Sequence, residues 1–314
     1  MTVLSRAVPW PSLVLAVCAA LLLACAAERA PAREPAPSAL APELPLPSGL
    51  DVAVRVDLTA LSAELGQALA RQFLSDAVSL AGSERSAALL ARALDRAALL
   101  WVGLPAASAT ERPAGVLVLR GHFSDVADDA SWSRRDSGVE LLELDPTDAG
   151  ASYARIYRLL GDEMLIWAPS GELSGVERAL AGDAVEAALR PPERGAVSLA
   201  ARPAGVLARA EARYPELAQR FRDVRRIEAF AEPTAGMWRA DLTLDFASAA
   251  RAAEATDVLE RLRQALTGRR CALGVVARAV AVTSFERDVR VQTVLIGPEL
   301  EAVKACVLGD GCCA

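Results

Sequence analysis

The stretch "GMWRADLTLDF", Gly236–Phe246, carries the clearest fold signal in the chain. Apolar and polar side chains alternate from Trp238 to Phe246, so an extended strand would have one apolar face and one polar face. A sheet with one wet face is typical of antiparallel pairing. The stretch therefore predicts an antiparallel sheet whose apolar face is covered by other elements.

Segments with strand or helix patterns surround this stretch, in an order that occurs twice along the chain. Strands are expected at 52–58, 97–105, 114–123, 138–145, 153–160 and 163–169, and again at 196–203, 226–233, 236–246, 278–285 and 289–296. Helices are expected at 59–81 with Thr59 as cap, at 83–96, and at 125–132 with Ser124 as cap. The second half adds helical sequence up to about residue 224, a long helix at 247–267 ending at Gly268, and a closing helix.

The closing helix of each half has a similar sequence. "ELSGVERALAGD", Glu172–Asp183, aligns with "ELEAVKACVLGD", Glu299–Asp310, and both place glutamate in the first turn and glycine just past the end. The repeated order predicts an α+β fold of two tandem pseudo-repeats, residues 50–190 and 191–314. Each repeat is expected to be a mostly antiparallel sheet with helices on one face, and the joint is expected near "LRPPERG", Leu189–Gly195.

The N-terminal part has a different character. Residues 1–24 contain one charged side chain, Arg6, followed by the apolar run "SLVLAVCAALLLA", and this arrangement is typical of a signal peptide. The run is shorter than the roughly 20 apolar residues that a spanning helix needs. Residues 25–49 are rich in alanine and proline, so they are expected to form an extended, semi-rigid linker.

The signal ends in "LLAC", Leu22–Cys25, which resembles the lipobox of bacterial lipoproteins. The resemblance covers only the export signal. It implies cleavage before Cys25, a thioether-linked diacylglyceryl group and further acylation on that residue, and hence a membrane anchor at the N-terminus. Ala26 follows the cysteine; if the source is Gram-negative, the resemblance implies the periplasmic face of the outer membrane. The alternative is ordinary signal cleavage near Ala26 or Ala27, without lipid.

The charge of the chain and the motifs that it lacks exclude some classes of function. The chain carries 34 basic and 40 acidic residues, a net charge of −6, and it has no long basic run, so nucleic acid is not an expected partner. Its one histidine, His122, rules out a zinc site built from several histidines, and no metal or cofactor is expected. His122 is interpreted as a residue at a strand–helix corner, with a functional role as the alternative. Asp125, Asp128 and Asp129 are interpreted as a solvated helix start, with cation binding or paired carboxylates as the alternative.

Aromatic residues on the expected strands allow two interpretations. Tyr153, Tyr157, Trp101, Trp167 and Trp238 lie on those strands, where they either pack in the core or line a groove. Core packing is the expectation for such positions.

Four cysteines remain after Cys18 in the signal and the lipidation candidate Cys25. Cys271, Cys306, Cys312 and Cys313 are an even number in an exported chain, so at least one disulfide is expected, from Cys271 to Cys312 or Cys313. Cys306 is alternatively a buried free thiol, and binding of a metal by the four thiols is the functional rival.

Three functions stay open at this point. The first is a non-catalytic envelope lipoprotein that binds a protein or polymer partner, which is favoured because no catalytic set appears in the sequence. The second is a carrier of an apolar ligand held between helices and a sheet. The third is an enzyme such as a carboxylate-dependent hydrolase.

Overall fold

The structure is a computed structural model. It describes residues 46, 49–65, 84–105, 115–123, 132–136, 140–144, 152–158, 163–169, 189–204, 207, 215–234, 236–269 and 271–307.

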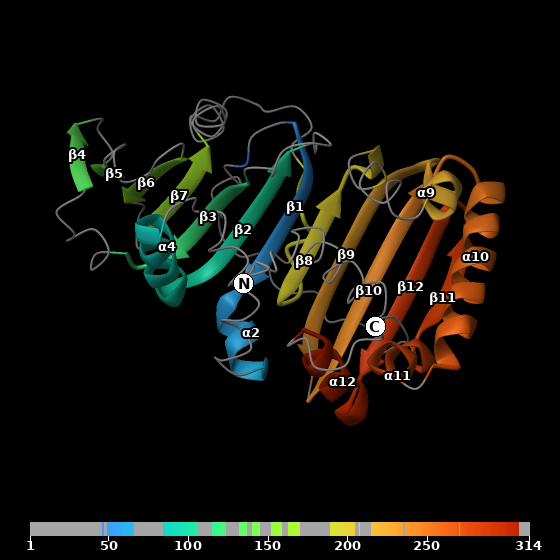
Figure 1. Cartoon of the computed structure of the whole chain (residues 1–314). Helices are drawn as coiled ribbons and strands as arrows, with labels where there is room; N and C mark the ends of the chain where they lie inside the picture. Colours follow the sequence, from blue (N-terminus) through green and yellow to red (C-terminus); the bar gives the residue numbers. More distant parts are fainter. Residues whose placement is uncertain are drawn as a thin grey trace, which may run out of the picture.

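Within these residues, twelve strands form one antiparallel sheet, in the order β11-β12-β10-β9-β8-β1-β2-β3-β7-β6-β5-β4 (Figure 1). The strands of the first half are β1 (Leu50–Asp57), β2 (Ala97–Pro105), β3 (Val116–Gly121), β4 (Trp132–Asp136), β5 (Glu140–Leu144), β6 (Ser152–Arg158) and β7 (Glu163–Pro169). Those of the second half are β8 (Val197–Ala201), β9 (Val224–Thr234), β10 (Met237–Phe246), β11 (Ala281–Phe285) and β12 (Asp288–Leu295).

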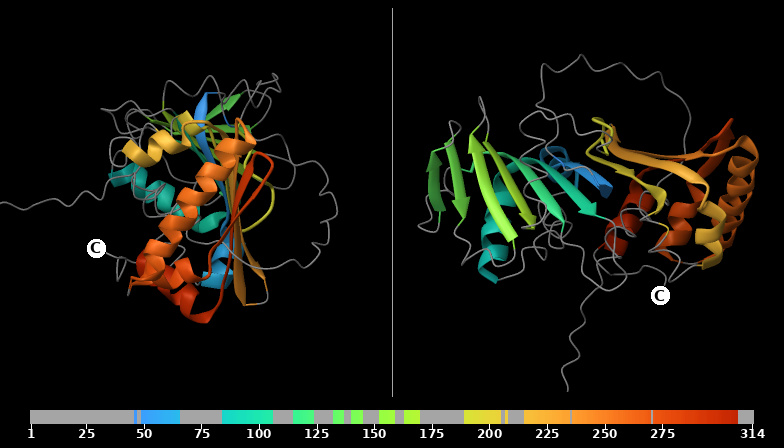
Figure 2. Two further views of the ribbon diagram at one scale, coloured as in Figure 1. Left: turned by 90° about the vertical axis from the view of Figure 1, so that its right-hand side faces the viewer. Right: turned by 90° about the horizontal axis from the view of Figure 1, so that it is seen from above.

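The described helices lie on one side of this sheet, as the edge-on view in Figure 2 shows. They are α2 (Leu58–Leu65), α4 (Glu84–Arg96), α9 (Pro215–Phe221), α10 (Ala249–Thr267), α11 (Ala272–Arg278) and α12 (Gly297–Val307). The predicted α+β class is therefore confirmed. None of these helices is long and apolar enough to cross a membrane.

The alternation in 236–246 has the predicted result. Trp238, Ala240, Leu242, Leu244 and Phe246 of β10 are all buried on the helix side of the sheet. The apolar face continues across the neighbouring strands. Leu242 lies opposite Ala229 of β9 and Val291 of β12, and both of these residues are also buried. The main core thus runs between the helices and one face of the sheet.

The first half also buries apolar side chains on the other face. Leu46, Leu50, Ala53, Val116, Val118, Met164, Ile166 and Ala168 form a second, smaller cluster there. The nearly continuous apolar runs of β2 and β3 predict central strands, and the structure confirms this because β3 has apolar partners on both faces.

The sequence predicts a sheet in each half, and the structure joins the two sheets into one. Strands β1 and β8 pair antiparallel, with Val54 opposite Leu199, in the middle of the sheet. The joint at residues 189–195 leads directly into this pair. Gly195 has a φ of +83°, which favours glycine, and a Cβ there would stand 2.7 Å from the carbonyl oxygen of Ala231.

Two local predictions are wrong, and one helix was not predicted. Thr59 is not the cap of the first helix, because α2 begins at Leu58 and the Asp57 carboxylate accepts a hydrogen bond from the backbone N–H of Ala60 at 2.9 Å. Trp132, expected in a short acidic helix, instead begins strand β4; residues 124–131 lie outside the described part. Helix α11, between α10 and β11, was not predicted.

Other helix predictions are confirmed or lie outside the described part. Helix α10 starts after Ser248, whose hydroxyl accepts from the Arg251 backbone N–H at 3.3 Å, and its last residue is followed by Gly268. Gly268 adopts a right-handed conformation rather than a left-handed one. The closing helix of the second half is α12, whereas the closing helix expected at 172–183 lies outside the described residues.

Candidate functional site

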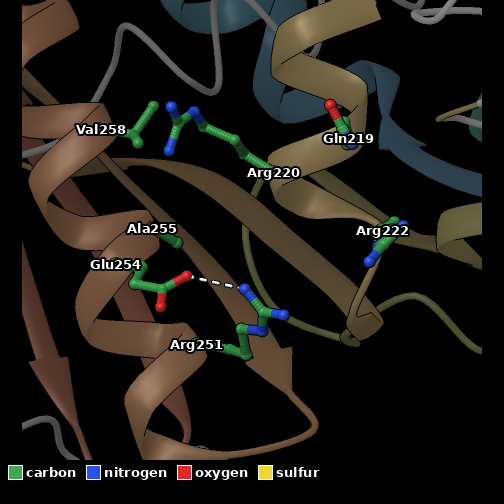
Figure 3. A pocket seen from close by; sticks show the side chains of 7 residues that line it. All are labelled: Gln219, Arg220, Arg222, Arg251, Glu254, Ala255 and Val258. Atoms are coloured by element: carbon green, nitrogen blue, oxygen red, sulfur yellow. Dashed lines mark hydrogen bonds and ion pairs between the residues drawn. The ribbon is translucent and has the colours of Figure 1, made fainter.

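A pocket of about 510 Å³ lies between α9 and α10, on the helix side of the sheet (Figure 3). Five of its seven lining residues are polar, and these include three arginines and one glutamate. The lining residues are Gln219, Arg220, Arg222, Arg251, Glu254, Ala255 and Val258. The pocket therefore presents a net positive charge.

The folding of this region follows from a few contacts at the end of β10. Phe221, the last residue of α9, packs against Phe246 with ring centroids 6.1 Å apart, and this contact ties α9 to the sheet. The carbonyl oxygen of Asp223 accepts a hydrogen bond from the N–H of Ala247 at 3.0 Å. The end of α9 and the start of α10 are thereby held side by side, with the pocket between them.

Arg251 is fixed by two carboxylates. Its guanidinium lies 2.8 Å from Glu254 Oε2 and 3.0 Å from Asp223 Oδ2. The hydrogen bond to Glu254, and then the charges of Glu254 and Asp223, raise the pKa of Arg251 above its ordinary value. The positive charge of Arg251 is thus permanent but largely balanced locally.

Arg220 and Arg222 differ from Arg251 in this respect. Both side chains are exposed, and neither makes an ion pair with a described residue. Figure 3 shows Arg220 reaching from α9 toward Val258 on α10. These two guanidinium groups supply the excess positive charge of the pocket.

The lining chemistry suits binding of an anion. A guanidinium presents five N–H donors in a planar fork that matches a carboxylate or phosphate group. It stays protonated at all physiological pH values, so it does not act as a general base. The pocket lining combines these donors with an amide and two small apolar side chains.

The residues singled out in the sequence do not meet in this pocket. His122 follows β3 directly and is exposed, as its interpretation at a strand end expects. Trp167 and Trp238 are buried on the helix side of the sheet, so core packing is confirmed for both. Asp125, Asp128 and Asp129 lie outside the described residues.

The remaining aromatic candidates are only partly described. Trp101 on β2 is half-buried and packs against the smaller apolar cluster. Tyr153 and Tyr157 lie on β6, opposite Ala168 and Met164 of β7. Their side chains lie outside the described part.

Cys271 is the only cysteine candidate with a described environment. It is the N-cap residue of α11 and is half of a disulfide. The side chain of Cys306 and the whole of Cys25, Cys312 and Cys313 lie outside the described residues, so the pairing stays a prediction. Within the described part, no group of three histidine, cysteine, aspartate or glutamate side chains could hold a metal ion.

Sequence reasoning missed the pocket arginines, although a signal was available. The segment "QRFRDVRR", Gln219–Arg226, carries four arginines in eight residues around the end of α9. Arg251 lies outside that segment, and the segment does not predict its place in the pocket, because this depends on the tertiary ion pair with Asp223.

Comparison with known proteins gives a fold but no family. No protein-family model matches the chain, and no curated protein matches it. Among solved structures, crystal form III of TP0453 matches with a TM-score of 0.51 and 12% sequence identity, covering 84% of this chain and 97% of that one. Crystal form I of TP0453 gives a TM-score of 0.49 at 12% identity, covering 86% and 99%. At this identity, the match with form III shows a similar fold and no more.

Proposed function

We propose that this chain is an exported, lipid-anchored envelope protein that binds a partner without catalysis. We further propose that the pocket between α9 and α10 receives an acidic group of that partner, a carboxylate or a phosphate. The observation that carries this proposal is the pair of exposed arginines, Arg220 and Arg222, which have no carboxylate partner among the described residues.

The arrangement of charges in the pocket favours a role in binding a partner over the interpretation that these arginines only contact water. Asp223 and Glu254 neutralise much of the charge on Arg251, so they hold that side chain at the pocket wall. Arg220, from the end of α9, and Arg222, from the turn after it, remain available for a ligand. A polymer or protein that carries repeated acidic groups fits such an open, positively charged pocket better than a small apolar molecule does.

The sequence supports the location in this proposal. Residues 1–24 fit a signal peptide, Cys25 fits the lipidated cysteine, and residues 25–49 fit a spacer between lipid and fold. The anchor would place the protein in the cell envelope, on the periplasmic face of the outer membrane if the source is Gram-negative. The apolar-ligand carrier and the carboxylate-dependent hydrolase have no supporting observation of their own.

Binding of two acidic polymers tests the pocket. Polyglutamate and inorganic polyphosphate present carboxylate and phosphate groups, and their affinities are measured by isothermal titration calorimetry at low salt. The double variant Arg220→Gln/Arg222→Gln should weaken binding at least about tenfold, because one charge-assisted hydrogen bond contributes about 1.5–3 kcal/mol.

The matched control is Arg225→Gln/Arg261→Gln, which removes the same charge from exposed positions outside the pocket lining. It should change affinity by much less. Equal losses in the two double variants would mean that net charge alone attracts the polymer, and the pocket would have no special role.

We also propose that residues 50–190 and 191–314 are tandem pseudo-repeats. Support comes from the strand order outward from the centre of the sheet, which is β1-β2-β3-β7-β6 on one side and β8-β9-β10-β12-β11 on the other. The β6–β7 hairpin then corresponds to the β11–β12 hairpin, and the first half has β5 and β4 in addition.

For the disulfide, we propose Cys312 or Cys313 as the partner of Cys271.

A further inference from the structure

Strand β11 lies at one end of the sheet. It pairs with β12 on one side, from Ala281 opposite Gln292 to Phe285 opposite Asp288, and no described strand pairs with its other side. The topologically similar strand β6 pairs with β7 on one side and with β5 on the other. The position that β5 occupies beside β6 is thus open beside β11 in the described sheet.

The direction of the backbone groups on β11 follows from its neighbours. The carbonyl oxygen of Arg287 accepts from the N–H of Phe246 and so faces β10. Because successive residues of a strand point their backbone groups to opposite sides, Asp288, Arg290 and Gln292 face β11. Their partners Phe285, Thr283 and Ala281 face back toward β12. Val282 and Ser284 therefore turn their N–H and C=O groups to the open edge.

This edge strand lacks two of the features that normally prevent pairing, charged side chains and prolines. Proteins protect edge strands with charges, prolines or bulges. β4, at the opposite end of the sheet, carries Arg134, Arg135 and Asp136, whereas β11, "AVTSF", carries no charge and no proline.

Apolar side chains are also exposed beside β11. Phe285 on β11 is 70% exposed, and Leu262 is 44% exposed on α10, the helix that packs against β11. Burial of such side chains would add to the backbone hydrogen bonds of an added strand.

We propose that β11 pairs antiparallel with β11 of a second copy of this chain, around a two-fold axis at Thr283. This register places Val282 of one copy opposite Ser284 of the other, so every outward-facing backbone group of both strands finds a partner. Two-fold axes at Val282 or Ser284 would leave part of these groups unpaired.

Side chains are compatible with this register. Phe285 would lie opposite Ala281 of the second copy, on the face away from the helices, where a small residue leaves room for the ring. Thr283 would lie opposite its own counterpart, and cross-strand threonine pairs are favourable. The two sheets would become one continuous sheet with a closed, symmetric interface. This inference is independent of the pocket and of the lipid anchor.

A cysteine at the axis tests the register. At a position where the backbone groups point away from the partner strand, facing α-carbons lie about 4.5 Å apart, within disulfide range. Thr283→Cys should therefore form a covalent dimer under mild oxidation, seen on a non-reducing gel. Ser284→Cys is the matched control, because Ser284 is also exposed but would be displaced from its own counterpart.

Charge variants test self-pairing. Light scattering after gel filtration should show a dimer for the native chain and monomers for Thr283→Lys and Thr283→Glu alone, because like charges then face each other. Mixing the two charged variants should restore the dimer. Thr283 is exposed, and circular dichroism checks that each variant is folded.

Several outcomes would overturn the proposal. The proposal is wrong if the native chain stays monomeric, including the case in which β11 pairs with a strand of another protein. A dimer that persists in both charged variants would place the interface elsewhere. Equal cross-linking of Thr283→Cys and Ser284→Cys would exclude the register.

Discussion

At the scale of single residues, Asp57 determines where helix α2 begins. Asp57 ends β1 and caps α2, with its carboxylate oxygen 2.9 Å from the N–H of Ala60. We expect Asp57→Ala to lower the free energy of unfolding by about 1 kcal/mol, because the capping bond is lost. Thr59→Ala should have little effect, since Thr59 lies inside the helix and is exposed. Urea unfolding followed by circular dichroism measures both, and a larger loss for Thr59→Ala would contradict the assignment.

The same scale shows what a sequence can say about a site. Both Asp57 and Thr59 are good capping residues, and only the end of β1 decides between them. The arginines near Gln219 are visible as a cluster in the sequence. Arg251 has carboxylate partners, whereas Arg220 and Arg222 have none among the described residues. This difference depends on contacts between α9, α10 and the turn at Asp223, which no local pattern encodes.

At the scale of elements, α10 carries a pH-dependent contact on its surface. The carboxylate of Glu260 accepts hydrogen bonds from Arg263 Nε at 2.7 Å and from Gln264 at 3.0 Å. The hydrogen bond from Arg263 lowers the pKa of Glu260 below its usual value. A lowered pKa in the folded state means that the carboxylate stabilises the fold above the ordinary glutamate pKa, and that this contribution disappears as the pH falls through the lowered value.

Glu260→Gln should therefore be less stable than the native chain at neutral pH by about 0.3 kcal/mol, the usual size of an exposed helical pair. The difference should vanish in acid. Thermal unfolding of both proteins at several pH values measures it, with Asp257→Asn as a control, because that change removes an exposed carboxylate from the same helix. A difference that grows as the pH falls would contradict the sign.

The elements themselves were predictable where their pattern was long. The alternation in 236–246 and the amphipathic helix at 247–267 agree with β10 and α10 within two residues at each end. Helix α11 was missed because seven residues, "ALGVVAR", are too few to show a helical period. Strand β4, "WSRRD", was missed because it is polar and lies at the edge, where burial imposes no pattern.

At the scale of the whole molecule, the proposed anchor determines where the fold resides. Cys25→Ser should move the protein from the membrane fraction to the soluble fraction, because two acyl chains hold a protein stably at a membrane and their loss leaves no comparable anchor. Cell fractionation followed by immunoblotting measures this, and Cys18→Ser is the control because that residue would be removed with the signal. Retention of the Cys25→Ser protein in the membrane would contradict the anchor.

The continuity of the sheet was not predictable from the sequence. Both halves have strand patterns, but nothing in the pattern of residues 50–57 says that their second neighbour is 197–201 rather than another strand. Partner choice in a sheet depends on the whole set of strands and on the lengths of the connections between them. A pattern of alternation gives the face of each residue but not the identity of the neighbouring strand.

The pairing of β1 with β8 also has a consequence for the order of folding. A ribosome makes the N-terminal half first, so β1 and β2 are complete well before β8 exists. During that interval one edge of β1 has no native neighbour, and the apolar side chains Val52, Val54 and Val56 point toward a core that is only half assembled. Such a nascent chain is prone to pair with the wrong strand, and pairing between segments so distant in the sequence is slow. The central strand of the finished sheet is therefore the segment that most needs to be kept from premature contacts until synthesis has passed Ala201.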